Sequence, residues 1–167
     1  MIVLGIDPGS ATTGYGVVAR TSGGAVSLLE CGVIRTGPGQ PLAARLRQIF
    51  EGVSEVLARH AVDELAVETV FYARNVRTTV VLGHARGAAL LAGALRDLPV
   101  AEYAPAEVKN AIVGSGRATK EQMQFMVQQL LRLRSQPRPA DAADAVAVAL
   151  CHCQASHLKQ RLQGATR

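Results

Sequence analysis

Two kinds of hydrophobic pattern alternate along this chain. Short runs of continuous apolar, β-prone residues are bounded by glycine, proline or serine, which is typical of buried strands. Longer runs carry apolar residues at helical spacing, as between Leu42 and Leu57. The predicted strands are 2–7, 14–19, 25–34, 64–68 and 100–104, and the predicted helices are 41–60, 75–98, 105–113, 119–133 and 139–159.

The connections between these elements predict how the strands pair. Short turns join the first three strands, which therefore form an antiparallel meander, whereas helices precede the last two strands, as in parallel pairing. The sequence thus predicts an α/β fold of the ribonuclease H-like kind. In it, a mixed five-stranded sheet, made of the antiparallel meander plus parallel strands, has helices on both faces. We assign residues 1–158 to this single domain and residues 159–167 to a disordered, polar and basic tail.

Four carboxylates stand at the ends of predicted elements. Asp7 and Glu68 each close a strand, while Asp141 and Asp144 lie three residues apart at the start of the last helix and project from one face of it. Strand ends of a parallel sheet gather along one edge, so these acids are expected to converge. Carboxylate oxygens suit Mg²⁺ or Mn²⁺ rather than zinc. The pattern therefore predicts a divalent metal site.

Simpler interpretations exist for some of these acids. Asp141 can cap its helix and complement the helix dipole, and Asp7 can belong to a plain turn. These alternatives suit Asp144 less well, because its helix is apolar on nearly all sides and a buried carboxylate needs a partner or a metal. Glu68 follows a fully apolar strand and is also unlike a simple surface charge.

Composition narrows the function without deciding it. The chain of 167 residues is 49% hydrophobic, yet no apolar run reaches the roughly 20 residues of a membrane span. It shows no signal-peptide pattern, so we expect a cytoplasmic protein with no membrane partner. A net charge of +5 beside an acidic cluster favours a polyanion substrate, although such a charge also serves solubility alone.

The triplet Cys151-His152-Cys153 does not predict zinc, because positions two apart on a helix point about 200° apart.

Several short motifs recur in a specific order over nearly the whole chain. They are Gly5-Ile6-Asp7-Pro8-Gly9, Val67-Glu68-Thr69-Val70-Phe71, Ala85-Arg86-Gly87, Pro105-Ala106-Glu107-Val108-Lys109 and Asp141-Ala142-Ala143-Asp144-Ala145. In this order and spacing the chain resembles the RuvC family of bacterial Holliday-junction resolvases. The resemblance implies a homodimeric endonuclease that cuts two opposed strands of a four-way DNA junction, after branch migration by RuvA and RuvB. It also implies Mg²⁺, two ions for each active site, with Mn²⁺ as a substitute.

The same resemblance implies roles for single residues. The four acids match the family's metal-binding catalytic positions. Phe71 matches an aromatic residue that stacks on an unpaired junction base, while Lys109 and Lys120 match basic residues near the cut strand, Lys120 being counted as catalytic. The neighbours Tyr72, Arg74 and Arg77 suit base stacking and phosphate contacts. Alternatively, Phe71 is a core residue and Lys120 an ordinary surface lysine.

Small residues on the helix at 75–98 suggest an assembly. Gly83 and Gly87 lie on one face, where each glycine costs about 1 kcal/mol against alanine, and Ala88, Ala92 and Gly93 extend the small-residue surface. We predict that a second copy packs there, because a twofold dimer matches the approximate symmetry of a four-way junction. Packing on the protein's own sheet is the alternative.

Two further functions fit parts of the pattern. The segment from Gly5 to Gly9 also suits phosphate binding in kinases of the actin and sugar-kinase type, but such proteins need a second, similar domain for which this chain has no room. A junction-binding protein without nuclease activity is the third possibility. Metal-dependent nicking of a four-way junction separates the three.

Overall fold

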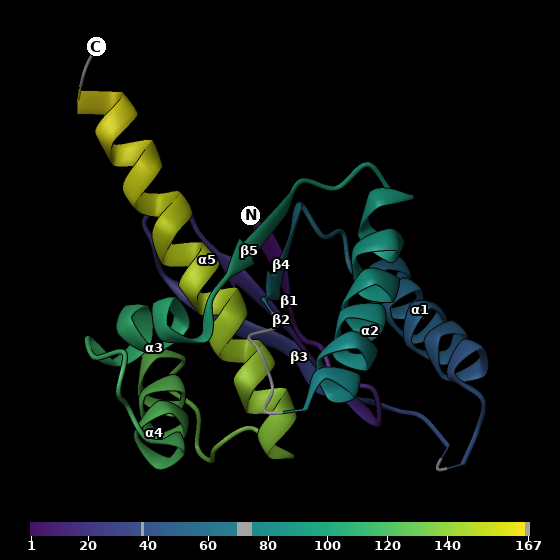
Figure 1. The fold of residues 1–167 in the computed structure, drawn as a ribbon. Coiled ribbons are helices and arrows are strands. Elements are labelled where there is room, and N and C mark those ends of the chain that lie inside the picture. Colours follow the sequence, from purple (N-terminus) through teal and green to yellow (C-terminus); the bar gives the residue numbers. More distant parts are fainter. Residues whose placement is uncertain (38, 70–74, 166–167) are drawn as a thin grey trace.

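The computed structural model describes residues 1–37, 39–69 and 75–165, with side chains as far as Lys159. Its strands are β1 (Ile2–Asp7), β2 (Thr12–Arg20), β3 (Val26–Arg35), β4 (Glu64–Glu68) and β5 (Val100–Tyr103). Its helices are α1 (Leu42–Arg59), α2 (Val76–Ala94), α3 (Pro105–Val113), α4 (Lys120–Leu130) and α5 (Ala140–Ala165) (Figure 1). Each element predicted from the sequence is present.

Three helix ends differ from the prediction by three residues or more, and the first is that of α4, which ends at Leu130 rather than at residue 133. Helix α2 stops at Ala94 rather than at residue 98, because the chain turns there and Asp97 takes a left-handed conformation with φ of 55°. Helix α5 runs on to Ala165, through most of the segment 159–167 that the sequence assigned to a tail. In Figure 1 this end of α5 projects beyond the rest of the molecule.

The sheet has the predicted mixed topology, with strand order β3-β2-β1-β4-β5. Strands β1, β2 and β3 pair antiparallel, and Asp7 lies opposite Gly14. Strands β1, β4 and β5 pair parallel, which places Glu68 opposite Tyr103 at the edge where Asp7 ends its strand. Both pairing predictions are therefore confirmed.

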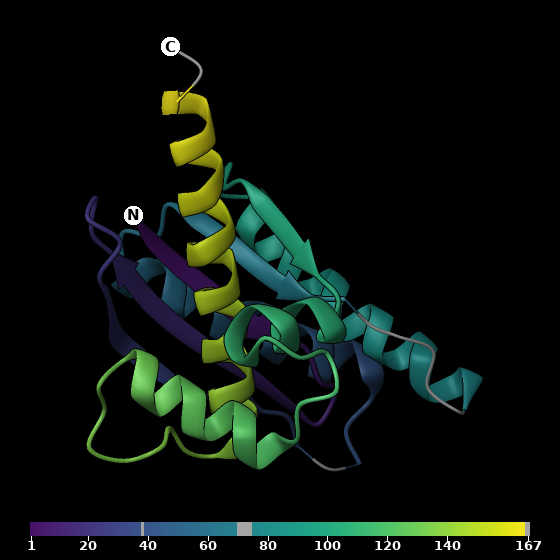
Figure 2. The ribbon, with the colours of Figure 1, turned by 90° about the vertical axis from the view of Figure 1, so that its left-hand side faces the viewer.

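Helices cover both faces of this sheet. Helices α1 and α2 pack on one face, and α3, α4 and α5 lie on the other (Figures 1 and 2). Side chains alternate between the faces, so Leu4 and Ile6 join the core under α1 and α2 whereas Val3 joins the core under α5. The same alternation turns Asp7 toward α5, and in β4 it turns Glu68 to the face of the buried Ala66.

Glycines in β1 and β2 let α5 lie unusually close to the sheet. A Cβ atom added to Gly5, Gly14 or Gly16 would overlap backbone or side-chain atoms of α5. At Gly14 the overlap is with the carbonyl oxygen of Asp141 itself. These glycines therefore permit the close approach that brings the acids of α5 to the end of β1.

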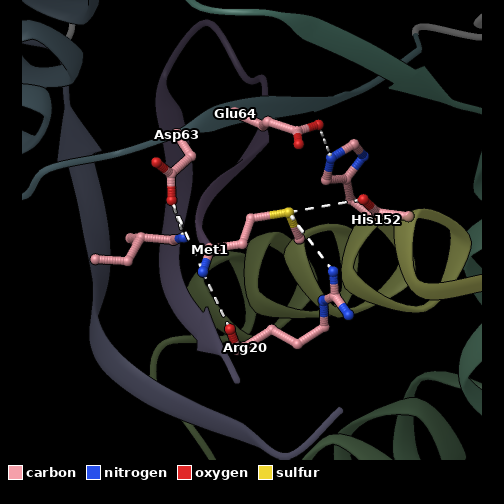
Figure 3. Close-up of polar contacts among 7 residues, drawn as sticks. Met1, Arg20, Asp63, Glu64 and His152 are labelled. Atoms are coloured by element: carbon pink, nitrogen blue, oxygen red, sulfur yellow. Dashed lines mark hydrogen bonds and ion pairs between the residues drawn. The ribbon is translucent and has the colours of Figure 1, made fainter. Parts of the chain in front are cut away.

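Polar contacts also fix α5 to the parallel strands. The buried His152 of α5 lies with Nε2 2.7 Å from Glu64 Oε2 and with Nδ1 2.7 Å from the Tyr103 hydroxyl. Figure 3 shows Glu64 and His152 facing each other, beside Met1, whose amine lies between Arg20 and Asp63. His152 is thus bound to side chains of β4 and β5.

Over the described residues, no helix has both the length and the apolar character to cross a membrane.

Candidate metal centre

Three of the predicted acids come together at one end of the sheet. Asp7 ends β1, while Asp141 and Asp144 lie in the first turns of α5. One carboxylate oxygen from each of these residues lies within 4.8 Å of the other two. The chain thus gathers three half-buried carboxylates from its two ends.

Glu68 joins this group through Asp7. The pKa of Glu68 is raised to about 8, chiefly by burial and then by the neighbouring charge of Asp7 and a hydrogen bond with its carboxyl group. Burial, followed by the charge of Asp144, raises the pKa of Asp7 to about 6. Both shifts have the same physical origin: negative charges are crowded into a site that is partly removed from water.

A pocket of about 290 Å³ opens over these acids. Its wall includes Asp7, Glu68 and Asp144, together with both lysines that the sequence singled out. The ammonium Nζ of Lys120 lies 3.3 Å from Asp144 Oδ2, and the charge of Asp144 raises the pKa of Lys120. The remaining lining residues are Pro105, Val108, Met123 and Ala147, with Lys109 as the second lysine.

The donor set of the pocket fits a divalent metal. All ligand atoms offered by Asp7, Asp141, Asp144 and Glu68 are carboxylate oxygens, which hard cations such as Mg²⁺ and Mn²⁺ prefer. Burial and the neighbouring carboxylates both raise the pKa values of Asp7 and Glu68, and the charges of Lys120 and Lys109 offset these effects only in part. A divalent cation would provide that compensation.

Four of the other predicted site residues belong to the segment that follows Glu68. Phe71, Tyr72 and Arg74 fall outside the described residues. Arg77 lies exposed in the first turn of α2, where its backbone N–H donates to the side chain of Asn75. The structure therefore brings the acids and the lysines together and places Arg77 on α2.

The small-residue surface of α2 is only partly as predicted. An added Cβ at Gly83 or Gly87 would meet no described atom within 4 Å, so these glycines do not pack on the protein's own sheet. The prediction that Ala92 and Gly93 continue this surface is wrong, because Ala92 is buried in the core and Gly93 packs closely on Leu65. The open surface is thus limited to the earlier turns of α2.

Sequence reasoning missed the positioning role of Gly14 and Gly16. A signal for both was present, because glycine inside a strand pattern often marks the close approach of another backbone. The sequence alone did not identify the segment that approaches them.

Comparisons with known proteins agree with this geometry. Residues 3–152 match the family model described as crossover junction endodeoxyribonuclease RuvC. The protein of that name from Desulforamulus reducens is 49% identical over 154 residues, which cover 92% of this chain and 94% of that relative. The structure of Thermus thermophilus RuvC is similar, with a TM-score of 0.87, 40% identity and coverage of 95% of this chain and 97% of that one. T. thermophilus RuvC in complex with a Holliday junction substrate gives a TM-score of 0.86 at 37% identity, covering 95% and 96%.

Proposed function

The chain belongs to the RuvC family of crossover junction endodeoxyribonucleases, and from this premise we propose that it resolves four-way DNA junctions by metal-dependent nicking of two opposed strands. The observation that carries this proposal is the convergence of Asp7, Asp141 and Asp144 beside Glu68, in a pocket flanked by two lysines. Acids alone would repel a DNA phosphate. With a divalent cation and the lysines, the same pocket attracts it.

In this proposal the four carboxylates hold Mg²⁺, with two ions in each active site and Mn²⁺ as a substitute. Such ions, when bound, supply the positive charge that activates the attacking water and stabilises the leaving oxygen. The contribution of the chain is to fix the carboxylates before DNA arrives. Gly5 and Gly14 allow α5 to reach the sheet, and the buried strand β1 holds Asp7 in place.

The lysines act on the scissile phosphate. Lys109 and Lys120 line the pocket from α3 and α4, opposite the strand ends that carry Asp7 and Glu68. Each ammonium group adds positive charge next to the phosphate, where negative charge develops during hydrolysis. Val108 and Met123 form an apolar part of the pocket wall, and a less polar surrounding strengthens these interactions.

Junction recognition is assigned to the segment that follows Glu68. We propose that Phe71 stacks on an unpaired base at the junction centre, with Tyr72, Arg74 and Arg77 contributing stacking and phosphate contacts. The exposed position of Arg77 at the start of α2 supports this assignment, because no carboxylate neutralises it among the described residues.

Cutting of two opposed strands requires two active sites, so the proposal includes a twofold dimer. The open surface at Gly83 and Gly87 supports an interface through α2, where Val76 and Val80 are also exposed. A hollow of about 330 Å³ beside Gly87, between α1 and α2, offers room for side chains of a second copy.

In the cell this dimer would act in the cytoplasm after branch migration by RuvA and RuvB.

Nicking of a synthetic four-way junction tests the proposed function. In Mg²⁺ we expect paired cuts in opposed strands of the junction, and no cuts in a linear duplex that contains the same arm sequences. Chelation of the metal should stop the reaction. Equal cutting of junction and duplex would contradict junction specificity, and binding without cutting in both Mg²⁺ and Mn²⁺ would identify a binding protein instead.

A further inference from the structure

The positive charge of the chain is concentrated around α4. Residues 114–140 contain five basic residues and one acidic residue, so this segment carries +4 of the net charge of +5. The basic residues are Arg117, Lys120, Arg132, Arg134 and Arg138. A polyanion that approaches the molecule is therefore attracted to this segment.

The arginines of this segment have no internal partner among the described residues, unlike several arginines elsewhere in the fold. Arg45 donates to the carbonyl of Ser10, Arg59 pairs with Glu30, and Arg96 donates to the carbonyl of Leu57. By contrast, within the described part of the chain no hydrogen bond or ion pair engages the exposed guanidinium groups of Arg117, Arg132, Arg134 and Arg138. These charges are available to an external ligand.

One of these arginines, Arg138, lines a hollow between α4 and the start of α5. The hollow has a volume of about 580 Å³ and is lined by Gln124, Gln136, Pro137, Arg138, Pro139 and Ala140. We call it the α4–α5 hollow. The same two helices line both sites: Met123 of α4 and Asp144 of α5 line the metal pocket, and Gln124 of α4 and Ala140 of α5 line the hollow. The lining of the hollow contains no carboxylate.

The chemistry of the α4–α5 hollow suits a phosphodiester backbone. A guanidinium group binds phosphate with a planar pair of N–H donors, and the amides of Gln124 and Gln136 add further N–H donors. Arg138 stands between Pro137 and Pro139, whose rings restrict the backbone on both sides. Less conformational freedom is therefore lost when Arg138 binds a ligand.

The hollow also lies on the side of the active site away from the open face of α2. Figure 1 shows α2 and α4 on opposite sides of the molecule, with the first turns of α5 between them. If two copies meet through α2, each α4–α5 hollow points outward from the dimer. A DNA arm that leaves the junction centre would cross the metal pocket and then reach the hollow.

We propose that the α4–α5 hollow binds the sugar–phosphate backbone of the outgoing DNA arm, with the Arg138 guanidinium on a phosphate beside the scissile one. The inference rests on the proposed function, since it takes the metal pocket as the place of cutting. The contact with Arg138 would be a second contact on the strand that is cut. It would fix the register of the DNA arm without reading its sequence.

Junction binding at several salt concentrations tests this contact, with Ca²⁺ in place of Mg²⁺ to prevent cutting. Arg138→Gln should weaken binding about tenfold, and the slope of log affinity against log salt should fall by about 1. Arg138→Lys should retain most of the slope, because it keeps the charge. The matched control is Lys159→Gln, which removes one charge from α5 roughly 27 Å beyond Asp141 and should leave the slope unchanged.

Neutral methylphosphonate linkages then locate the phosphate. One such linkage beside the cut should weaken binding by the wild-type protein but not by Arg138→Gln, because the variant no longer contacts that position. Equal slopes for Arg138→Gln, Lys159→Gln and the wild type would overturn the proposal, provided that melting temperatures match. If Arg138→Gln does not fold, Arg138→Lys takes its place in the test. Binding by Arg138→Lys must then be weakened only by the neutral linkage that also weakens binding by the wild type. Failure of the wild type to nick junctions would instead count against the proposed function.

Discussion

Asp7 and Glu68 bind protons more tightly in the folded, metal-free protein than in an unfolded chain. Their pKa values, about 6 and about 8, exceed the unfolded values of about 3.9 and 4.3. The resulting contribution to the free energy of unfolding is complete below about pH 4, and it is lost as the pH rises through about 6 and then about 8. The carboxylate cluster thus makes the metal-free protein less stable at neutral and alkaline pH than at mildly acidic pH.

The melting temperature of the metal-free protein should therefore fall as the pH rises from about 5 to about 8. Asp7→Asn should show a smaller fall, because it removes one titrating group and also the charge that raises the pKa of Glu68. Scanning calorimetry in a chelator at constant ionic strength measures both profiles. Added Mg²⁺ should raise the melting temperature of the wild type at the alkaline end more than that of the variant. Parallel profiles for the two proteins would rule out this account of the site.

At the residue scale, the sequence could predict which side chains form the site but not their protonation. Asp7, Glu68, Asp141 and Asp144 were identifiable because acids at element ends break an apolar pattern. The pKa shifts depend on burial and on distances between carboxylates, which only the folded chain sets.

At the scale of elements, the site depends on how closely α5 packs on β1 and β2. Apolar runs and turn residues were sufficient to predict each strand and helix, and connection lengths were sufficient to predict their pairing. The contact of Gly14 with the start of α5 joins residues more than a hundred positions apart, so no local pattern could indicate it. The end of α2 was misplaced for a related reason, because Asp97 in a left-handed turn has no unique sequence signal.

Gly14→Ala should separate the two halves of the metal centre. The added methyl group would overlap the Asp141 carbonyl, so the first turn of α5 must shift. We expect a loss of stability of about 1–3 kcal/mol and a loss in nicking rate of about a hundredfold, since a misplacement of about 1 Å has effects of that size. Gly23→Ala is the control, because a Cβ there has only one neighbour, at 3.9 Å. Nicking at the wild-type rate by Gly14→Ala would show that close packing is not required.

At the scale of the whole molecule, the two ends of the domain have different surfaces. The open face of α2 suits a second copy, and the basic segment around α4 suits DNA. The charge concentration was already visible in the sequence, whereas the position of the α4–α5 hollow and the metal pocket on the same two helices required the fold.

The proposed dimer predicts different effects for two substitutions at one position. Gly87→Ala should leave assembly intact, because a Cβ meets open space within the protomer and a small residue still allows close approach. Gly87→Leu should weaken dimerisation and turn paired nicks into single ones. Sedimentation at micromolar concentration measures the first effect, and a cruciform plasmid reports the second as nicked rather than linear product. A wild-type monomer that still makes paired cuts would falsify the dimer.

The central claim is that the carboxylate cluster holds the metal that cuts the junction, and one comparison tests it most directly. Nicking in Mg²⁺ and junction affinity in Ca²⁺ are measured for the wild type, Asp141→Asn and Asp97→Asn. Asp97 is an exposed acid in the turn after α2 whose left-handed backbone asparagine tolerates, so it is a matched control. We predict that Asp141→Asn loses nearly all nicking and keeps its affinity, because binding depends mainly on basic groups, while Asp97→Asn behaves as the wild type. Nicking by Asp141→Asn at the wild-type rate would contradict the claim.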